Sequence, residues 1–473
     1  MNRFVKIGKI KPKSSNEIES SIFGIGFEKL DRKVFEPNCA YDKIALLGVK
    51  HARVQSGWMR TENERGVYNF EWLDDIINNL LSRGIKPWLS LSYGNPLYTP
   101  KAKEVFGGVG CPPIKTEKEK QAWVNYCTAL AEHYKGRVIE FEIWNEPDGD
   151  HCWKFGASGS EYGELTVLSA KAIKSVIPDA RIIGGALGSR ECIGWLYDAF
   201  SQGMADYLYA ISYHDYCEKE TRSTEFNRVL RAIVDEFNPN IKLIQGETGC
   251  PSFSEGFGAL CYGKWTEKKQ AKLLLRRVIT EVKNGVDKIS WFTAVDMIEA
   301  LNGVVGDKKS YLDYGYFGVL GAEFDEDGNS VGNYRFKPSF YAYQNLISAL
   351  SDATLTNLPI VFHWSEYSMR PNQMTEEYDG LLTASFKRDN GSKAFIYWKP
   401  TNVLTTEFES ICSVILPPFF KDIKLVDLLT GEVFTLPDKI IETYPDKSIK
   451  INTLPVFDHP LMLTFGDFVE IEN

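Results

Sequence analysis

Two glutamates end apolar, strand-like runs, at points where the chain leaves a sheet and enters a loop. Glu146 ends the run FEIWNEP, and Glu247 ends the run LIQGETG. Cleavage of a glycosidic bond needs such a pair, because one carboxyl protonates the leaving oxygen and an opposed carboxylate bonds to the anomeric carbon. The carboxyl that acts as the acid needs a raised pKa, which the nearby anion of the other carboxylate would provide. This chemistry requires a fold that brings the two residues face to face.

Between residues 21 and 349, eight short β-branched or aromatic runs alternate with longer segments of helical period. Eight repeated βα units predict an α/β fold of the (β/α)8 TIM barrel type. Functional residues of such a barrel lie at the carboxyl ends of its strands, so Glu146 and Glu247, after the fourth and seventh runs, should face each other across the mouth. The predicted strands are residues 21–27, 49–54, 86–93, 138–144, 180–185, 207–213, 241–246 and 288–293.

The pattern changes after the barrel to alternating runs separated by turn residues, as in LLTASFKRDNGSKAFIYW. This pattern predicts an accessory antiparallel β-sandwich domain over residues 350–473, next to the catalytic barrel of residues 21–349. Residues 1–20 contain the strand-like run RFVKIGKI, which we expect to join the sandwich.

Charge and composition narrow the possible partners and location. The 473 residues carry a net charge of -9, with a pI near 5.4 and no dense run of Lys or Arg, so no nucleic-acid partner is expected. No segment approaches the ~18 apolar residues of a membrane span, and the first residues lack the apolar core of an export signal. Nine cysteines without a C-x-x-C pair fit a reduced set. We therefore predict a cytoplasmic protein without a membrane partner.

The motifs resemble those of the clan A retaining glycoside hydrolases, which carry WNEP after the fourth strand and a nucleophilic Glu after the seventh. The run from YNFEWLDDIINNLLSRGIKPWLSLSYGNPLY to WNEP is most similar to family 39, which includes β-xylosidases. The resemblance covers about residues 21–349. It implies a carbohydrate substrate and neither a metal nor an organic cofactor. It also implies that Glu146 is the acid/base and that Glu247 is the nucleophile, so we expect the anion Glu247 to raise the pKa of Glu146.

The resemblance implies roles for five further residues. Asn145 matches the Asn that hydrogen-bonds the sugar hydroxyl next to the reacting carbon. Arg53 matches the Arg that keeps the nucleophile ionised, since a cation within ~4–6 Å lowers a carboxyl pKa by about 1–3 units. His214 and Tyr216 match a His-x-Tyr motif whose Tyr hydroxyl aligns the nucleophile. Trp291 matches an aromatic floor beneath the sugar.

Other residues receive predictions of their own. Glu28, after the first strand, is more reminiscent of the family 51 arabinofuranosidases, where a Glu contacts sugar hydroxyls, so we interpret it as a glycone-binding residue. Glu140 and Glu142 are interpreted as structural carboxylates paired with buried cations. The predicted aromatic residues of the pocket rim are Tyr98, Trp153, Phe253 and Trp265.

These features favour a retaining exo-glycosidase, β-xylosidase-like, that hydrolyses β-linked glycosides or short oligosaccharides by double displacement. An α-L-arabinofuranosidase or an endo-acting hydrolase on the same scaffold is the alternative. A non-catalytic carbohydrate-binding protein would be expected to have lost at least one of the matched residues, and all of them are present. A metal-dependent hydrolase needs a His/Asp cluster at the strand ends, where the sequence offers only His214.

Overall fold

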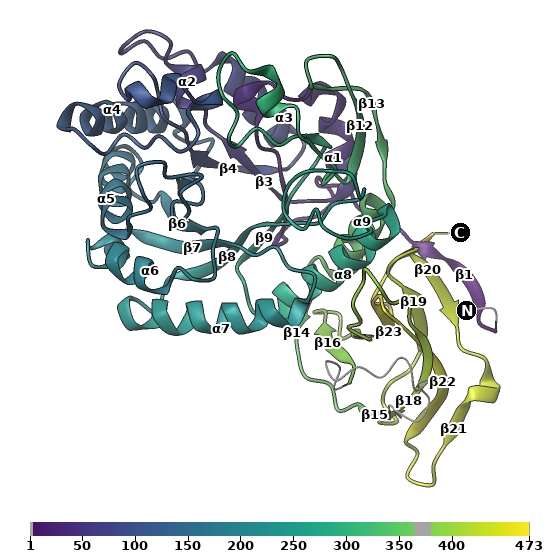
Figure 1. The fold of residues 1–473 in the computed structure, drawn as a ribbon. Coiled ribbons are helices and arrows are strands. Elements are labelled where there is room, and N and C mark those ends of the chain that lie inside the picture. The colour runs from purple at the N-terminus through teal and green to yellow at the C-terminus, as the bar shows by residue number, and fades with distance from the viewer. Residues whose placement is uncertain (1–2, 364–379, 473) are drawn as a thin grey trace.

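A computed structural model describes residues 3–363 and 380–472. Eight parallel strands close into a barrel in chain order, surrounded by helices (Figure 1), which confirms the predicted TIM barrel. Each strand overlaps one of the predicted runs. The barrel strands are β2 (Phe23–Gly26), β3 (His51–Gln55), β4 (Lys86–Leu91), β5 (Glu140–Ile143), β6 (Arg181–Leu187), β7 (Leu208–His214), β8 (Lys242–Thr248) and β9 (Lys288–Trp291).

The covering helices turn one apolar face toward the barrel. In α3 (Glu71–Ser82) the buried stripe includes Ile76 and Leu80 at helical spacing. The Asn69 side chain accepts a 2.9 Å hydrogen bond from the first backbone N–H of this helix, and Gly84, with φ 74°, ends it. The other helices are α1 (Tyr41–Leu47), α2 (Trp58–Thr61), α4 (Glu117–Tyr134), α5 (Gly159–Val176), α6 (Ile193–Phe200), α7 (Glu220–Phe237), α8 (Glu267–Lys283) and α9 (Pro338–Leu350).

The barrel interior is filled by side chains. Where the strands begin, the ammonium of Lys288 lies 4.7 Å from the centre of the Trp88 ring and pairs with Glu140. Where the strands end, Arg53 and Glu142 pair at 2.6 Å, and both are fully buried. Both predictions that these glutamates meet buried cations are therefore confirmed. A separate apolar cluster of strand residues contains Trp88, Ile183, Ala210 and Ile244.

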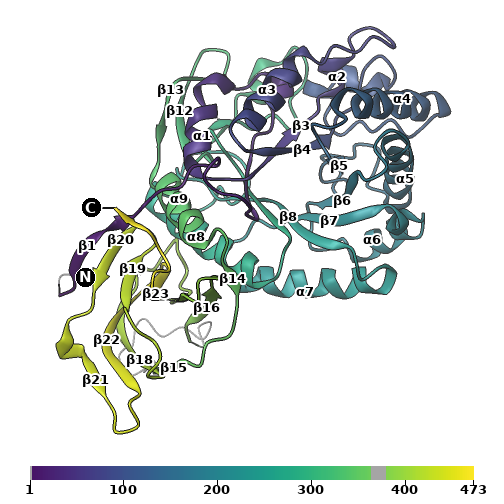
Figure 2. The ribbon, with the colours of Figure 1, turned by 180° about the vertical axis from the view of Figure 1, so that it is seen from behind.

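An antiparallel two-sheet domain lies beside the barrel and holds both ends of the described chain (Figure 2), which confirms the predicted sandwich. The larger sheet has the order β14-β16-β17-β23-β19-β20-β1-β24, and the smaller has the order β15-β18-β22-β21. β1 (Val5–Ile10) pairs with β20 and β24, so the N-terminal segment lies in the larger sheet. The remaining sandwich strands are β14 (Thr354–Leu355), β15 (Val361–His363), β16 (Leu382–Lys387), β17 (Lys393–Trp398), β18 (Glu409–Leu416), β19 (Lys424–Asp427), β20 (Glu432–Thr435), β21 (Ile441–Thr443), β22 (Ile449–Phe457), β23 (Leu461–Phe465) and β24 (Ile471–Glu472).

The segment between β9 and α9 forms two small hairpins. These are β10 (Met297–Ile298) with β11 (Tyr314–Gly315), and β12 (Leu320–Phe324) with β13 (Ser330–Phe336). The first hairpin brings Glu299 beside the barrel mouth.

Buried polar contacts join the sandwich to the barrel. Lys272 of α8 pairs with Asp458 at 2.7 Å, and the Trp398 indole donates a 2.8 Å hydrogen bond to Glu220 of α7. All four side chains are buried, so the two units share a packed interface. None of the helices in the described ranges is long and apolar enough to cross a membrane.

Candidate active site

A cavity of about 520 Å³ opens at the carboxyl ends of the barrel strands. Arg53 is fully buried and contacts the cavity floor through its guanidinium. Trp291 is also fully buried and does not line the cavity, so its role as a sugar floor stays a prediction, while the adjacent Phe292 does line it. The structure brings the other six predicted site residues together in the cavity wall: Glu28, Asn145, Glu146, His214, Tyr216 and Glu247.

Glu247 is held by two side chains. Arg53 Nη1 donates to its Oε2 at 2.8 Å, and the Tyr216 hydroxyl donates to its Oε1 at 2.6 Å. Burial, reinforced by the charge of Glu247, raises the pKa of Tyr216 well above its ordinary value, so its hydroxyl remains a donor. A register shift between Gln245 and Thr248 reorients the end of β8. These contacts fix the carboxylate in one orientation, as a nucleophile requires.

Arg53 connects Glu247 to the rest of the cavity floor. Its Nη2 donates to Asn145 Oδ1 at 2.8 Å, which sets the orientation of that amide, and its Nη1 lies 3.4 Å from Glu28. Burial lowers the pKa of Arg53, but the surrounding carboxylates, Glu142 first among them, raise it by more. Burial also raises the pKa of Glu28 to about 8, with Arg53 opposing this rise and Glu247 adding to it. One cation therefore serves several acidic groups.

Glu146 leaves β5 through an unusual turn. Trp144 and Glu146 have φ values of 67° and 44°, in the left-handed region. The Glu146 oxygens accept hydrogen bonds from His214 Nδ1 at 2.9 Å and from His151 Nε2 at 2.6 Å. Burial raises the pKa of Glu146, but these two hydrogen bonds lower it by more, to below its ordinary range. The predicted rise is therefore wrong, because the two imidazoles dominate the surroundings of this carboxylate.

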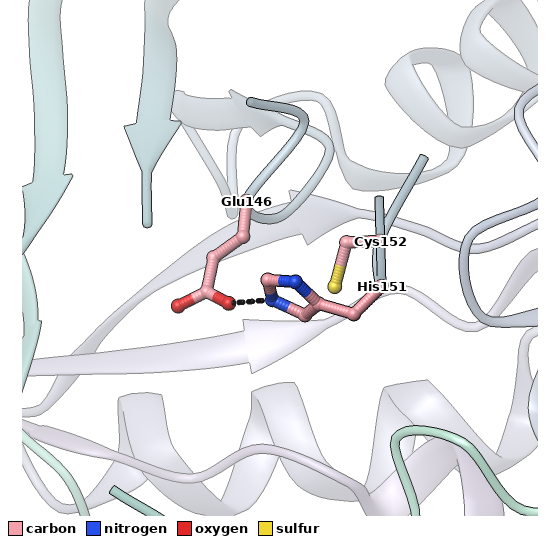
Figure 3. A group of neighbouring side chains, drawn as sticks. All are labelled: Glu146, His151 and Cys152. Atoms are coloured by element: carbon pink, nitrogen blue, oxygen red, sulfur yellow. Dashed lines mark hydrogen bonds and ion pairs between the residues drawn. The ribbon is translucent and has the colours of Figure 1, made fainter. Parts of the chain in front are cut away.

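His151 is a site residue that the sequence motifs did not identify. Figure 3 shows its ring directed at Glu146, with Cys152 beside it. The thiol of Cys152 and the carboxylate of Glu146 raise the pKa of His151 to about 11. The available sequence signal is a histidine close to Glu146 in the run NEPDGDHC. Spacing alone does not reveal that the loop folds back to bring the two side chains together.

Two groups of three possible metal ligands occur in the described ranges, and both contain Glu146. One group adds His151 and Cys152, and the other adds His214 and Glu247. In both groups the imidazole nitrogens that face Glu146 lie at hydrogen-bond distance, 2.6 and 2.9 Å. Because a nitrogen that donates its N–H to a carboxylate cannot also bind a metal, we assign a metal ion to neither group.

The aromatic residues of the rim differ from the prediction. Trp153 and Trp265 are buried because they pack inward, and the Trp153 ring lies 6.0 Å from that of Trp144. The loop after β8 instead supplies Phe257 and Tyr262, which line the cavity and are 50% and 57% exposed. None of the four predicted rim residues lines the cavity: Tyr98, Trp153, Phe253 and Trp265.

Comparison with known sequences agrees with this geometry. Residues 32–353 match the family model described as glycosyl hydrolases family 39. A β-xylosidase of Geobacillus stearothermophilus is 31% identical over 140 residues, covering 28% of this chain and 27% of that protein. A β-xylosidase of Caldicellulosiruptor saccharolyticus is 30% identical over 197 residues, covering 38% of this chain and 39% of that protein. The alignments therefore span less than half the length of either relative.

Comparison with solved structures agrees at the level of the fold. A family 39 glycoside hydrolase from Bacteroides cellulosilyticus WH2 superposes with a TM-score of 0.63 at 16% identity. The superposition covers 94% of this chain and 80% of that one. At this identity the likeness shows a shared fold and nothing finer.

Proposed function

Because the chain belongs to the glycosyl hydrolases of family 39, we propose that it is a retaining exo-glycosidase, β-xylosidase-like, acting on β-linked glycosides or short oligosaccharides. The observation that carries the proposal is the opposition of Glu146 and Glu247, which bring one carboxylate oxygen each to within 4.8 Å of the other. Retaining enzymes hold their two carboxyl groups about 5–5.5 Å apart, and inverting enzymes about 6.5–9.5 Å. The short separation supports double displacement.

In the first step Glu247 attacks the anomeric carbon while Glu146 protonates the leaving oxygen. The Arg53 and Tyr216 contacts keep the Glu247 carboxylate ionised and aligned for this attack. Asn145 binds the hydroxyl next to the reacting carbon, a contact that strengthens as positive charge develops. In the second step Glu146 takes a proton from water, and this water releases the sugar from Glu247.

The cavity supports removal of terminal units. Its volume of about 520 Å³ is within the usual range for small-ligand pockets. Leu260 and Tyr262 from the loop after β8, and Leu301 from the segment after β10, also line it. Walls from different loops favour a pocket for the end of a short chain over an open groove.

The placement of Glu28 favours a second candidate, an α-L-arabinofuranosidase. Glu28 is 1% exposed and lines the cavity floor, where it is available to bind sugar hydroxyls. A panel of 4-nitrophenyl glycosides separates the two candidates, because preference for the α-L-arabinofuranoside over the β-xyloside would replace the first with the second.

Domain roles and location complete the proposal. We assign residues 21–349 to the catalytic unit, and the described residues of 1–20 and 350–473 to the sandwich that supports it. All nine cysteines are free, which supports action in a reducing compartment such as the cytoplasm.

The test is chemical rescue of the nucleophile. We expect Glu247→Gly to lose hydrolysis of aryl β-xylosides, and added azide to restore release of the aryl group with formation of an inverted glycosyl azide. NMR of the first sugar released by the wild type should show retained configuration. An inverted first product, or near-wild-type activity in Glu247→Gly, contradicts the proposal.

A further inference from the structure

The loop after β5 is shaped to place the His151 ring against Glu146 (Figure 3). Gly149 provides the space, because a methyl group on its Cα would lie 2.5 Å from Cε1 of His151. The loop is also tied to the barrel, since the Trp144 indole donates a 2.8 Å hydrogen bond to the backbone oxygen of Cys152. The position of the ring is therefore a property of the loop itself.

The contacts of Glu146 require protons on two imidazoles. An ionised carboxylate only accepts hydrogen bonds, so the facing nitrogens of His151 and His214 must both carry N–H groups. The His214 side chain is fully buried, whereas 39% of the His151 side chain is exposed. His151 is therefore the partner of Glu146 that exchanges protons with water.

We propose that His151 is a positioning residue that supplies the proton of the catalytic acid, so that Glu146 and His151 act as one proton-sharing pair. The inference rests on the proposed function, because it names the source of the acid proton in that reaction. The pair also explains how Glu146, which accepts two hydrogen bonds as a carboxylate, can still act as an acid.

The proton balance of the step is simple. When the glycosidic bond breaks, its electron pair remains on the leaving oxygen, which takes a proton from Glu146. The Nε2 proton of His151 moves across the 2.6 Å hydrogen bond to Glu146 and leaves a neutral imidazole. In the second step water gives a proton to Glu146, which passes it back to Nε2 of His151, so the pair returns to its starting state.

The electrostatic surroundings agree with a pair that keeps its proton at neutral pH. Cys152 and Glu146 raise the pKa of His151 to about 11. Burial raises the pKa of Cys152, which keeps this thiol neutral. The titratable groups around the pair are Cys152 and Asp148 of the same loop, Cys111 and Lys154 beside the His151 backbone, His214 of β7 and Glu247 of β8.

Two variants test the pair in the full chain. His151→Gln retains an N–H donor that does not titrate, and Gly149→Ala displaces the ring without changing its chemistry. The matched controls are His133→Gln, which removes a histidine bound to Asp74 at 2.8 Å on the surface, and Gly194→Ala, where an added methyl meets nothing within 4 Å. For each protein, kcat/KM is measured against pH on an alkyl and a dinitrophenyl β-xyloside.

With the alkyl xyloside, both test variants should lose the alkaline part of the pH profile. We expect kcat/KM at pH 8 to fall by about tenfold or more, with a smaller fall at pH 5, because a lone carboxyl keeps part of its protonation at pH 5 and almost none at pH 8. The dinitrophenyl xyloside needs no acid, so its profile should not move, and both controls should match the wild type. An unchanged alkaline limb in folded His151→Gln overturns the inference.

A second measurement separates this inference from the proposed function. Nitrogen NMR reports the protonation of the His151 ring directly, with its signal assigned by its loss in His151→Gln. The ring should be protonated at pH 8 in the wild type and neutral in Glu146→Gln. A neutral ring at pH 8 in the wild type overturns the inference. A wild type without glycosidase activity but with a protonated ring overturns the proposed function and leaves the proton-sharing pair intact.

Discussion

The barrel interior carries an ionic cluster at each end, and in the cluster where the strands begin two cations pair with one carboxylate. There the two oxygens of Glu140 meet two cations, Lys288 and Arg181. Burial lowers the pKa of Lys288, and the charge of Glu140 opposes this shift. Because both of its oxygens are paired, Glu140 links strands β5, β6 and β9. It has no unpaired oxygen with which to act on a substrate.

The cluster where the strands end has the opposite balance. Arg53 alone pairs with three carboxylates, those of Glu28, Glu142 and Glu247. One oxygen of Glu142 has no hydrogen-bond partner among the described residues. Surplus negative charge is unfavourable in a buried site, but it stabilises a transition state that develops positive charge. Charge balance, more than charge content, therefore distinguishes the cluster of Glu140, which we call the structural cluster, from the cluster of Arg53, for which we propose a role in catalysis and which we call the functional cluster.

The largest expected effect follows from removing Glu146, the proposed acid, which lies beside the functional cluster. Glu146→Ala should slow hydrolysis of alkyl β-glycosides by about 10²–10⁴-fold, because an alkoxide leaves slowly without a proton. The first step with dinitrophenyl glycosides should be spared, since that leaving group needs no proton. Stopped-flow release of dinitrophenol measures this step. Equal slowing of both substrates would show that Glu146 is not the acid.

Removing the single cation of the functional cluster should reduce both activity and stability. We expect Arg53→Met to lower kcat/KM by about 10²–10³-fold and the free energy of unfolding by about 3–5 kcal/mol, because Glu142 and Glu247 lose their shared partner. Arg53→Lys is the matched control, which keeps the charge with fewer donors and should recover part of each loss. Full activity in Arg53→Met would remove the functional role of this cluster.

Removing a cation from the structural cluster should reduce stability alone. Lys288→Met should lower the free energy of unfolding by about 3–5 kcal/mol, because it leaves Glu140 buried with one partner fewer. Its kcat/KM should stay close to the wild-type value. Chemical denaturation and a xyloside assay on the same preparation measure both quantities. A loss of kcat/KM as large as that of Arg53→Met would show that the two clusters do not differ in function.

The barrel and the placement of Glu146 and Glu247 at its mouth were predictable from sequence because they depend on short-range patterns. A strand buried on both faces reads as a nearly continuous apolar run, so β2 to β9 and their ends could be located. Residues at strand ends then converge by topology, which placed Glu146 opposite Glu247. Arg53 and Tyr216 followed from the family resemblance, and the structure brings both to Glu247.

Features that depend on how a loop folds were not predictable. Two residues with positive φ, Trp144 and Glu146, start the loop that carries His151, and nothing in their residue types requires that conformation. The predicted rim failed for a related reason, because an aromatic residue in a loop buries more apolar surface by packing inward, as Trp153 does on Trp144. The predicted rise in the pKa of Glu146 was wrong because this pKa depends on the contact with His151.

The smallest expected effect is a rise in the free energy of unfolding when Glu28 of the functional cluster is replaced by a neutral side chain. Burial raises the pKa of Glu28 from 4.5 to about 8, with Arg53 opposing this shift. Because the folded pKa lies above the unfolded one, folding favours the protonated carboxyl. This contribution is complete below about pH 4.5 and is lost as the pH rises through about 8.

Glu28→Gln keeps a neutral side chain at every pH. Its free energy of unfolding should therefore match that of the wild type at pH 4 and exceed it by about 1–3 kcal/mol at pH 8. Calorimetric unfolding of both proteins at the two pH values measures this difference. A difference that does not change with pH would mean that the pKa of Glu28 is the same in the folded and the unfolded protein, so that Glu28 is ionised at pH 8 and the functional cluster carries the negative charge of all three carboxylates.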